Sequence, residues 1–272
     1  MDNVRVIVNP QSSEPVPGME NITYEQPLNE RVRTFLRLEF LFQQTDHALK
    51  GTSQWDSRAA LASLLDIHNI FVRSDIKTEV IKELERETAN LAPLEQVPGI
   101  DKQRLNKTLD DMDLLNDKLH LKQGQIGQSL RDNEFISNVK QRSSIPGGTC
   151  DFDLPAYHYW LHQDAGRRMA DMKQWLSEFD TIRSAIELIL RQIRESAITD
   201  NQIAENGFYQ QNLDASTPFQ LIRVTLPVEA GLFAEISGGK HRFSIRFMNM
   251  HMRDRPVQTE RDVEFSLACC AL

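Results

Sequence analysis

Residues 238–248 read GGKHRFSIRFM, which is the clearest structural pattern in this chain of 272 residues. Apolar and polar side chains alternate strictly after residue 241, and alternation with a period of two is typical of a β-strand with one buried side. The two glycines ahead of it indicate a turn. The apolar side of the predicted strand consists of Phe243, Ile245 and Phe247, and the polar side of Arg242, Ser244 and Arg246.

The same segment is basic in an acidic protein. The chain has a net charge of −8, whereas residues 240–255 contain five Lys and Arg residues against one Asp, a local charge of +4. A strand that buries its apolar side and presents arginines to solvent suits an acidic partner. A structural alternative is that Arg242 and Arg246 form ordinary cross-strand ion pairs with Asp262 and Glu264 of the next strand. The residues alone leave both interpretations open.

The overall amino-acid composition is that of an ordinary acidic protein. Hydrophobic residues make up 40% and charged residues 26% of the chain, and the pI is about 5.4. This length can bury a sizeable core and lies near the size at which one core divides into two. The acidic balance argues against a dedicated nucleic-acid binder, and no apolar run is long enough to span a membrane. The three cysteines suggest neither a disulfide framework nor a metal site. The first residues lack a secretory signal, so we expect a cytoplasmic protein.

The first two thirds of the chain indicate helices. Residues 1–21 contain three prolines and no sustained period, so they are interpreted as a flexible leader. Residues 22–26 could form a short strand that joins a later sheet. Helices are then expected from residue 29 to about 49, 57 to 73, 74 to 92, 101 to about 119, 127 to 142, and in three further segments between 155 and 197. The first is apolar around most of its circumference, which predicts a position in the middle of a bundle. His68 is expected as a histidine at the edge of the core.

After residue 197 the pattern changes to alternation. Residues 222–226 and 263–269 alternate like residues 243–247, while residues 201–219 resemble a loop. The chain is therefore predicted to be an α+β protein, with an N-terminal helical domain (residues 22–198) followed by a small antiparallel β-domain (residues 199–272).

No pattern indicates catalysis or a bound cofactor. His158 and His162 have the spacing of two zinc ligands on a helix, but the neighbouring glutamate and a convincing third ligand are absent. Gly239-Lys240 does not complete a phosphate-binding loop, and no G-x-S-x-G motif occurs. We therefore expect no catalytic residues, no metal site and no cofactor.

A second functional class is an RNA-binding module that uses residues 240–248. Their basic and aromatic order loosely resembles an RNA-reading strand. Such a strand needs exposed aromatic rings for stacking, whereas Phe243 and Phe247 share a side with Ile245 and are expected in the core. The leading interpretation is therefore that no nucleic acid is bound.

Taken together, several segments resemble the Z-ring-associated protein D (ZapD) family of bacterial cell-division proteins. The similarity covers about residues 22–270, and the number and order of its short motifs make it specific. The motifs are PLNE at 27–30, RTFLRLEFL at 33–41, VPGID at 97–101, IGQ at 126–128 with Leu130-Arg131, SIPGG at 144–148, FDLP at 152–155, His158 with WLH at 160–162, NGFYQ at 206–210, and residues 236–248.

The resemblance implies a helical domain and a β-domain assembled as a symmetric homodimer. It also implies binding to the C-terminal tail of the tubulin-like GTPase FtsZ, cross-linking of FtsZ protofilaments into bundles, recruitment to midcell, and no enzymatic activity or membrane insertion. The positions that match the family's charged surface are Arg37, Arg131, His158, Arg242 and Arg246, with Arg33 and Lys240 as weaker neighbours.

Overall fold

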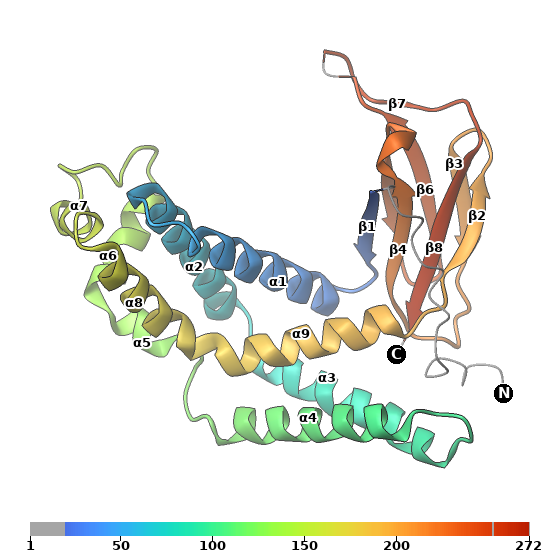
Figure 1. Cartoon of the computed structure of the whole chain (residues 1–272), viewed down its shortest axis with the longest axis horizontal. Helices are drawn as coiled ribbons and strands as arrows, with labels where there is room; N and C mark the ends of the chain where they lie inside the picture. Colours follow the sequence, from blue (N-terminus) through green and yellow to red (C-terminus); the bar gives the residue numbers. More distant parts are fainter. Residues whose placement is uncertain (1–19, 252, 272) are drawn as a thin grey trace. The chain divides into compact units, whose positions relative to one another are not determined.

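The computed structural model describes residues 20–251 and 253–271. Its helices are α1 (Glu30–Ala48), α2 (Gln54–Arg73), α3 (Ile76–Leu91), α4 (Lys102–Leu121), α5 (Gln128–Asp132), α6 (Glu134–Ser143), α7 (Pro155–Leu161), α8 (Ala165–Leu176) and α9 (Asp180–Glu195), with short 3₁₀ turns at Ala92–Gln96, Ser177–Phe179 and Val228–Ala230. Its strands are β1 (Asn21–Pro27), β2 (Asp200–Ala204), β3 (Phe208–Asn212), β4 (Phe219–Pro227), β5 (Leu232–Gly238), β6 (Arg242–Asn249), β7 (Val257–Gln258) and β8 (Val263–Ala271) (Figure 1). Helices followed by antiparallel strands confirm the α+β class.

The described chain divides into two compact units. The first, here called the β-unit, contains residues 20–34, 89–108 and 189–271. The second, here called the helical unit, contains residues 35–88 and 109–188. The part of the predicted leader before residue 20 lies outside the described residues. The expected strand near residues 22–26 is present as β1, which pairs with β4 along its whole length.

The β-unit contains two sheets, where the sequence predicted one. The first sheet has the strand order β1-β4-β8-β2, and the second has β3-β6-β5, with β7 also paired to β6. All of these pairings are antiparallel. Their buried side chains form one core, to which β2, β4 and β8 of the first sheet and β5 and β6 of the second contribute. The two sheets therefore pack face to face, as the alternation of buried and exposed residues in antiparallel sheets allows.

The connection between the two sheets lies in a segment that the sequence predicted as a loop. Residues 201–219 contain most of β2 and all of β3, joined by the dipeptide Asn206-Gly207. Both residues have positive φ, +50° and +71°, which is the backbone of a tight hairpin turn that Asn-Gly favours. A side chain at Gly207 would lie 2.6 Å from Thr259, so glycine is also required by space. The loop prediction was wrong because these short strands are largely polar, and their turn signal was not given enough weight.

The end of α9 is held to the first sheet by Glu25. Its carboxylate accepts two hydrogen bonds from Arg194, each 2.8 Å long, and one of 2.9 Å from Arg223 on the neighbouring strand. Burial acts to raise the pKa of Glu25, but the hydrogen bonds and positive charges of the two arginines outweigh it, so the pKa lies below the ordinary value of 4.5. Glu25 is therefore ionised and paired near neutral pH.

Replacing Glu25 with Gln is expected to destabilise the protein by about 1 kcal/mol at pH 7. Because the pKa of Glu25 is depressed in the folded state, its contribution is present above pH 4.5 and is lost as the pH falls through the folded-state pKa. The difference between wild type and Glu25→Gln should therefore shrink below pH 4.5. Denaturation followed by circular dichroism measures it, with the exposed Glu229→Gln as control. A difference that stays constant from pH 7 to pH 3 would contradict the charged interaction.

The helical unit buries many large apolar side chains. Its fully buried large side chains include Phe35, Phe42, Leu64, Met112 and Phe179. The first helix was predicted to lie in the middle of a bundle because most of its circumference is apolar, but Phe40 of α1 is 63% exposed, so part of this apolar surface is not covered. Among residues 20–251 and 253–271, no helix is both long and apolar enough to cross a membrane.

Two other boundaries differ from the predictions. Helix α2 begins three residues earlier than expected, because Ser53 and Asp56 form a capping box in which each side chain accepts a hydrogen bond from the other's backbone N–H. The single helix expected over residues 127–142 is broken at Asn133, whose side chain accepts a hydrogen bond from the backbone N–H of Ile136 and starts α6. A break at this point orients α5 and α6 independently.

Arg168 is a buried arginine of the helical unit, with 5% of its surface exposed. Its guanidinium donates to the Ser57 hydroxyl at 2.9 Å and to the backbone oxygens of Thr52 at 2.6 Å and Leu161 at 3.1 Å. It also donates to the backbone oxygen of Gln163. One planar group thus joins the segment before α2 to the end of α7.

Candidate functional site

Strand β6 has the alternation that its sequence predicts. Phe243, Ile245 and Phe247 are at most 1% exposed and lie in the core of the β-unit, whereas Arg242 and Arg246 are exposed on the outer side of the second sheet. The predicted buried and basic sides are therefore confirmed. We call Lys240, Arg242 and Arg246 the β6 basic face.

The alternative that Arg242 and Arg246 pair with Asp262 and Glu264 is wrong. Asp262 immediately precedes β8 and Glu264 lies in it, and β8 belongs to the other sheet, between β4 and β2. The Asp262 carboxylate instead accepts a hydrogen bond of 2.9 Å from the backbone N–H of Asn206. The neighbours of β6 are β3 and β5, so sequence order was a misleading guide to strand pairing.

The two arginines have different neighbours in the sheet. Arg246 lies between Phe208 of β3 and Glu235 of β5. Arg242 lies opposite Asn212 of β3, and on its other side its backbone oxygen accepts a hydrogen bond from Gly239. Within residues 20–251 and 253–271, neither arginine has a carboxylate within 4 Å. Both charges are therefore available to a ligand, and that of Arg242 is the less compensated, since it has no acidic neighbour across the strands.

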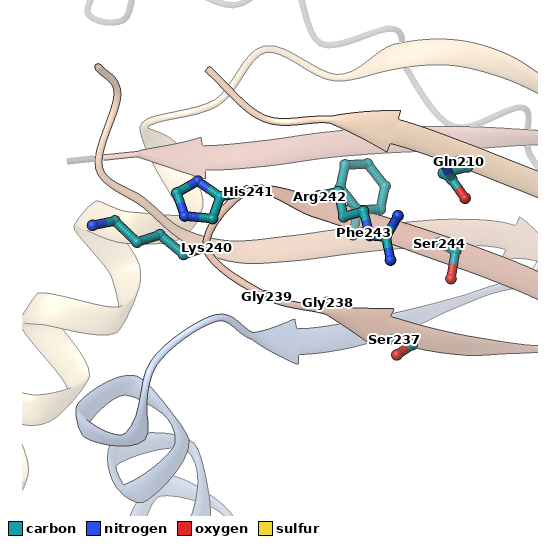
Figure 2. A pocket seen from close by; sticks show the side chains of 9 residues that line it. All are labelled: Gln210, Ser237, Gly238, Gly239, Lys240, His241, Arg242, Phe243 and Ser244. Carbon is teal, nitrogen blue, oxygen red and sulfur yellow. The ribbon is translucent and has the colours of Figure 1, made fainter. Parts of the chain in front are cut away.

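An open pocket of about 470 Å³ lies beside Arg242. Polar side chains of three strands and basic groups of the β5–β6 turn line it (Figure 2). The turn glycine, Gly239, has no atom of a non-neighbouring residue within 4 Å of the place where a side chain would start, so the space beside the turn is open. The lining side chains that can hydrogen-bond are Gln210, Ser237, Lys240, His241, Arg242 and Ser244. Hydroxyls and amides among cations suit the side chains and backbone of an acidic peptide.

The other four predicted site residues lie on helices. Arg33, in the second turn of α1, belongs to the β-unit and forms an ion pair of 3.1 Å with Glu30. Arg37, Arg131 and His158 belong to the helical unit and are exposed on α1, α5 and α7. The structure thus places Arg242 and Arg246 on the exposed side of β6, with Lys240 in the turn before it, whereas Arg37, Arg131 and His158 lie on three separate helices.

His158 and His162 lie side by side, with ring centroids 4.3 Å apart. His162 Nδ1 lies 2.9 Å from the backbone oxygen of His158, which is a hydrogen bond within the helix end. In the part of the chain that the structure describes, no three His, Cys, Asp or Glu side chains gather as metal ligands do. The RNA-binding alternative loses its stacking residues, because both phenylalanines of β6 lie in the core.

The sequence did not indicate the polar residues that complete the pocket. Gln210 and Ser237 lie on β3 and β5, neither of which was predicted as a strand. The Asn206-Gly207 turn was the available signal for β3, and the alternation of residues 232–237 was the signal for β5. Recognition of these strands would have assigned both residues to strands, but their position beside β6 depends on strand pairing.

Comparison with known proteins gives a consistent result. The family model described as "ZapD: Cell division protein" matches residues 36–246. A cell division protein ZapD from Methylococcus capsulatus is 44% identical over 92% of this chain and 98% of that protein. Proteins of the same name from Coxiella burnetii and Photobacterium profundum are each 38% identical, over 92% and 93% of this chain and 98% and 100% of their own lengths. The chain therefore belongs to the ZapD family of cell division proteins.

Proposed function

We propose that this protein is a non-enzymatic cross-linker of FtsZ filaments that acts at the division site. In this proposal each subunit binds the C-terminal tail of FtsZ, and a symmetric homodimer holds two tails that belong to different protofilaments. The observation that carries it is the β6 basic face, whose arginines are exposed and without ion pairs in the described chain. Membership of a cell-division family supports the choice of partner.

The proposed contacts follow from the charges. Lys240, Arg242 and Arg246 are assigned to acidic groups of the tail, since guanidinium and ammonium groups bind carboxylates most strongly when no internal acid competes. Arg33, Arg37, Arg131 and His158 are proposed as further contacts from the family resemblance. Of these, Arg33 is already paired with Glu30 and is expected to contribute least.

Bundling follows from two weak sites in one particle. A single peptide held by a few exposed cations is expected to bind with a Kd of about 10 μM. When one tail is bound, the second site meets its tail at an effective concentration on the order of 1 mM, which strengthens attachment roughly 100-fold if both tails can reach. A twofold dimer supplies the required pair of sites, and a monomer would bind without bundling.

The wild-type protein is expected to increase the light scattering and low-speed sedimentation of FtsZ polymerised with GTP. FtsZ lacking its C-terminal tail polymerises in the same assay and is the matched control, which should show no increase. An equal increase with tail-less filaments would place the contact elsewhere on FtsZ, and no increase with intact filaments would contradict the proposed function. Analytical ultracentrifugation at the assay concentration tests the dimer, because a single-subunit species could not cross-link.

A further inference from the structure

The outer side of the second sheet changes in character along β6. Side chains directly opposite each other on paired antiparallel strands lie on the same side of a sheet, so the register gives the neighbours on this side. Figure 2 shows one row, in which Gln210, Ser244 and Ser237 lie across three strands. The side therefore changes from basic and polar near the β5–β6 turn to partly aromatic at the other end of β6. The four rows, starting from that turn, are Asn212 with Arg242, then Gln210, Ser244 and Ser237, then Phe208, Arg246 and Glu235, and last Gln258, Met248 and Phe233.

Phe208, Phe233 and Met248 form the apolar part of this side, here called the β6 apolar end. Phe208 is 39% exposed, and Phe233 and Met248 are half-buried. Met248 lies opposite Phe233, and Phe208 is its diagonal neighbour, at a spacing that aromatic and long side chains bridge. The core lies on the other side of the same strands, where Ile245 and Phe247 are buried. The β6 apolar end is therefore a surface feature and is available to a ligand.

The β6 apolar end is continuous with the β6 basic face. Arg246 lies beside Phe208 in the register and two residues from Met248. At a rise of about 3.3 Å per residue, Arg246 lies about 7 Å from Met248 and about 13 Å from Arg242 along the strand. One strip of about 20 Å thus carries both arginines and, at one end, apolar side chains, and it matches about six residues of an extended peptide.

A peptide with acidic groups alone would leave the β6 apolar end exposed. Covering Phe208 with an apolar side chain removes apolar surface from water, which is favourable and does not depend on salt as a contact between charges does. Glu235 lies on the β5 side of Arg246 and repels a carboxylate there. An acidic residue is therefore expected to approach Arg246 from the side of Phe208, which brings its neighbours in the peptide over the apolar end.

We propose that the β6 apolar end binds an apolar side chain of the FtsZ tail, next to the acidic residue that contacts Arg246. The inference rests on the proposed function and adds the order of residues that the site selects. Side chains of an extended peptide return to the same side at every second residue. The apolar residue is therefore expected two positions from that acidic residue, and a second acidic residue, for Arg242, four positions from it in the opposite direction.

Binding of a fluorescent FtsZ tail peptide to the full chain, followed by anisotropy, tests the apolar contact. Phe208→Ser is expected to raise the Kd about tenfold, because it removes the apolar surface that the peptide covers. Phe208→Leu keeps an apolar side chain and should recover most of the affinity. The loss in Phe208→Ser should be nearly the same at low and high salt, whereas the loss in Arg242→Gln should shrink as salt is added.

Ile203→Ser is the matched control. Ile203 is an apolar residue of β2 in the other sheet and is 56% exposed, so its replacement should leave the Kd unchanged. Substitutions in the peptide make the test independent of protein folding. Replacing each apolar residue of the tail with Ser in turn should weaken binding to the wild type at one position or two, and the same replacement should have little effect on binding to Phe208→Ser.

The outcomes separate this inference from the proposed function. If the wild type bundles FtsZ but Phe208→Ser binds the tail as tightly as Ile203→Ser, the apolar contact is wrong and the proposed function stands. A wild type that does not bind the tail at all contradicts both. If Phe208→Ser runs as a smaller species in analytical ultracentrifugation, the β6 apolar end belongs to a subunit interface, and the inference is likewise overturned.

Discussion

Replacing both Arg242 and Arg246 with Glu is expected to abolish FtsZ bundling by this protein while the fold is retained. Each replacement changes a charge from +1 to −1, so the net charge falls from −8 to −12. Loss of two charge-assisted contacts, each worth about tenfold in affinity, should weaken tail binding by about 100-fold or more, before the added repulsion. Bundling requires two bound tails per dimer and should therefore disappear at micromolar concentrations.

Stability is expected to change little in the same variant. Neither arginine forms an ion pair in the described chain, so no internal contact is lost. Glu at position 246 would lie opposite Glu235, and such a like-charge pair costs about 0.5 kcal/mol. Position 242 has no acidic neighbour across the strands, so Arg242→Glu alone separates binding from stability most cleanly.

Sedimentation with FtsZ and thermal melting together check this prediction. The control Lys102→Glu/Lys107→Glu makes the same change in net charge on exposed residues of α4 and should bundle normally. Bundling by the wild type should also weaken as salt is added, because exposed charges are screened. Retained bundling in Arg242→Glu/Arg246→Glu would assign the contact to other residues, and a large loss of stability would show that the arginines support the fold.

Replacing Arg168 with Ala is expected to destabilise the helical unit by about 3 kcal/mol. The guanidinium satisfies Ser57 and the backbone oxygens of Thr52, Leu161 and Gln163, and its removal would leave buried acceptors without a donor and a cavity beside them. Arg168→Lys should recover only part of the loss, since one ammonium group cannot span the four acceptors of a planar guanidinium.

Tryptophan fluorescence during urea denaturation measures the stability of the helical unit in Arg168→Ala and the wild type. Trp55, Trp160 and Trp175 are the three tryptophans of the chain, and all lie in the helical unit. The neighbouring residue Arg167 is exposed, so Arg167→Ala should change the free energy of unfolding by less than about 0.5 kcal/mol. An equally small change for Arg168→Ala would show that the four hydrogen bonds contribute little net stability.

Local patterns predicted much of the fold. The period of two in residues 243–247 correctly identified both sides of β6, because alternation depends only on neighbouring residues of one strand. The capping residue Asn29 correctly located the start of α1, where its side chain accepts from the backbone N–H of Val32. Local patterns were least successful where segments are short and polar, as in β2 and β3.

The pairing of strands, and the grouping of side chains that are far apart in the sequence, depended on the tertiary structure. The partners of β6 could not be inferred from chain order, because β8 follows β6 in sequence but belongs to the other sheet. That choice determines whether Arg242 and Arg246 meet acids inside the protein or face solvent. The grouping of Gln210, Ser237 and Arg242 around one pocket was equally hidden, because these residues lie on three strands and meet only after the strands pair.

The sequence by itself determined most of the helices, the strands with clear alternation, the α+β class, the family and the residue composition of the basic strand. These follow from periodicity, capping and short motifs, all of which act over a few residues. Only the tertiary structure decided that the strands form two sheets and that the β6 arginines have no internal acid within 4 Å in the described chain. Electrostatic interactions depend on distance through space, and contacts between residues far apart in sequence leave no local pattern from which that distance could be inferred.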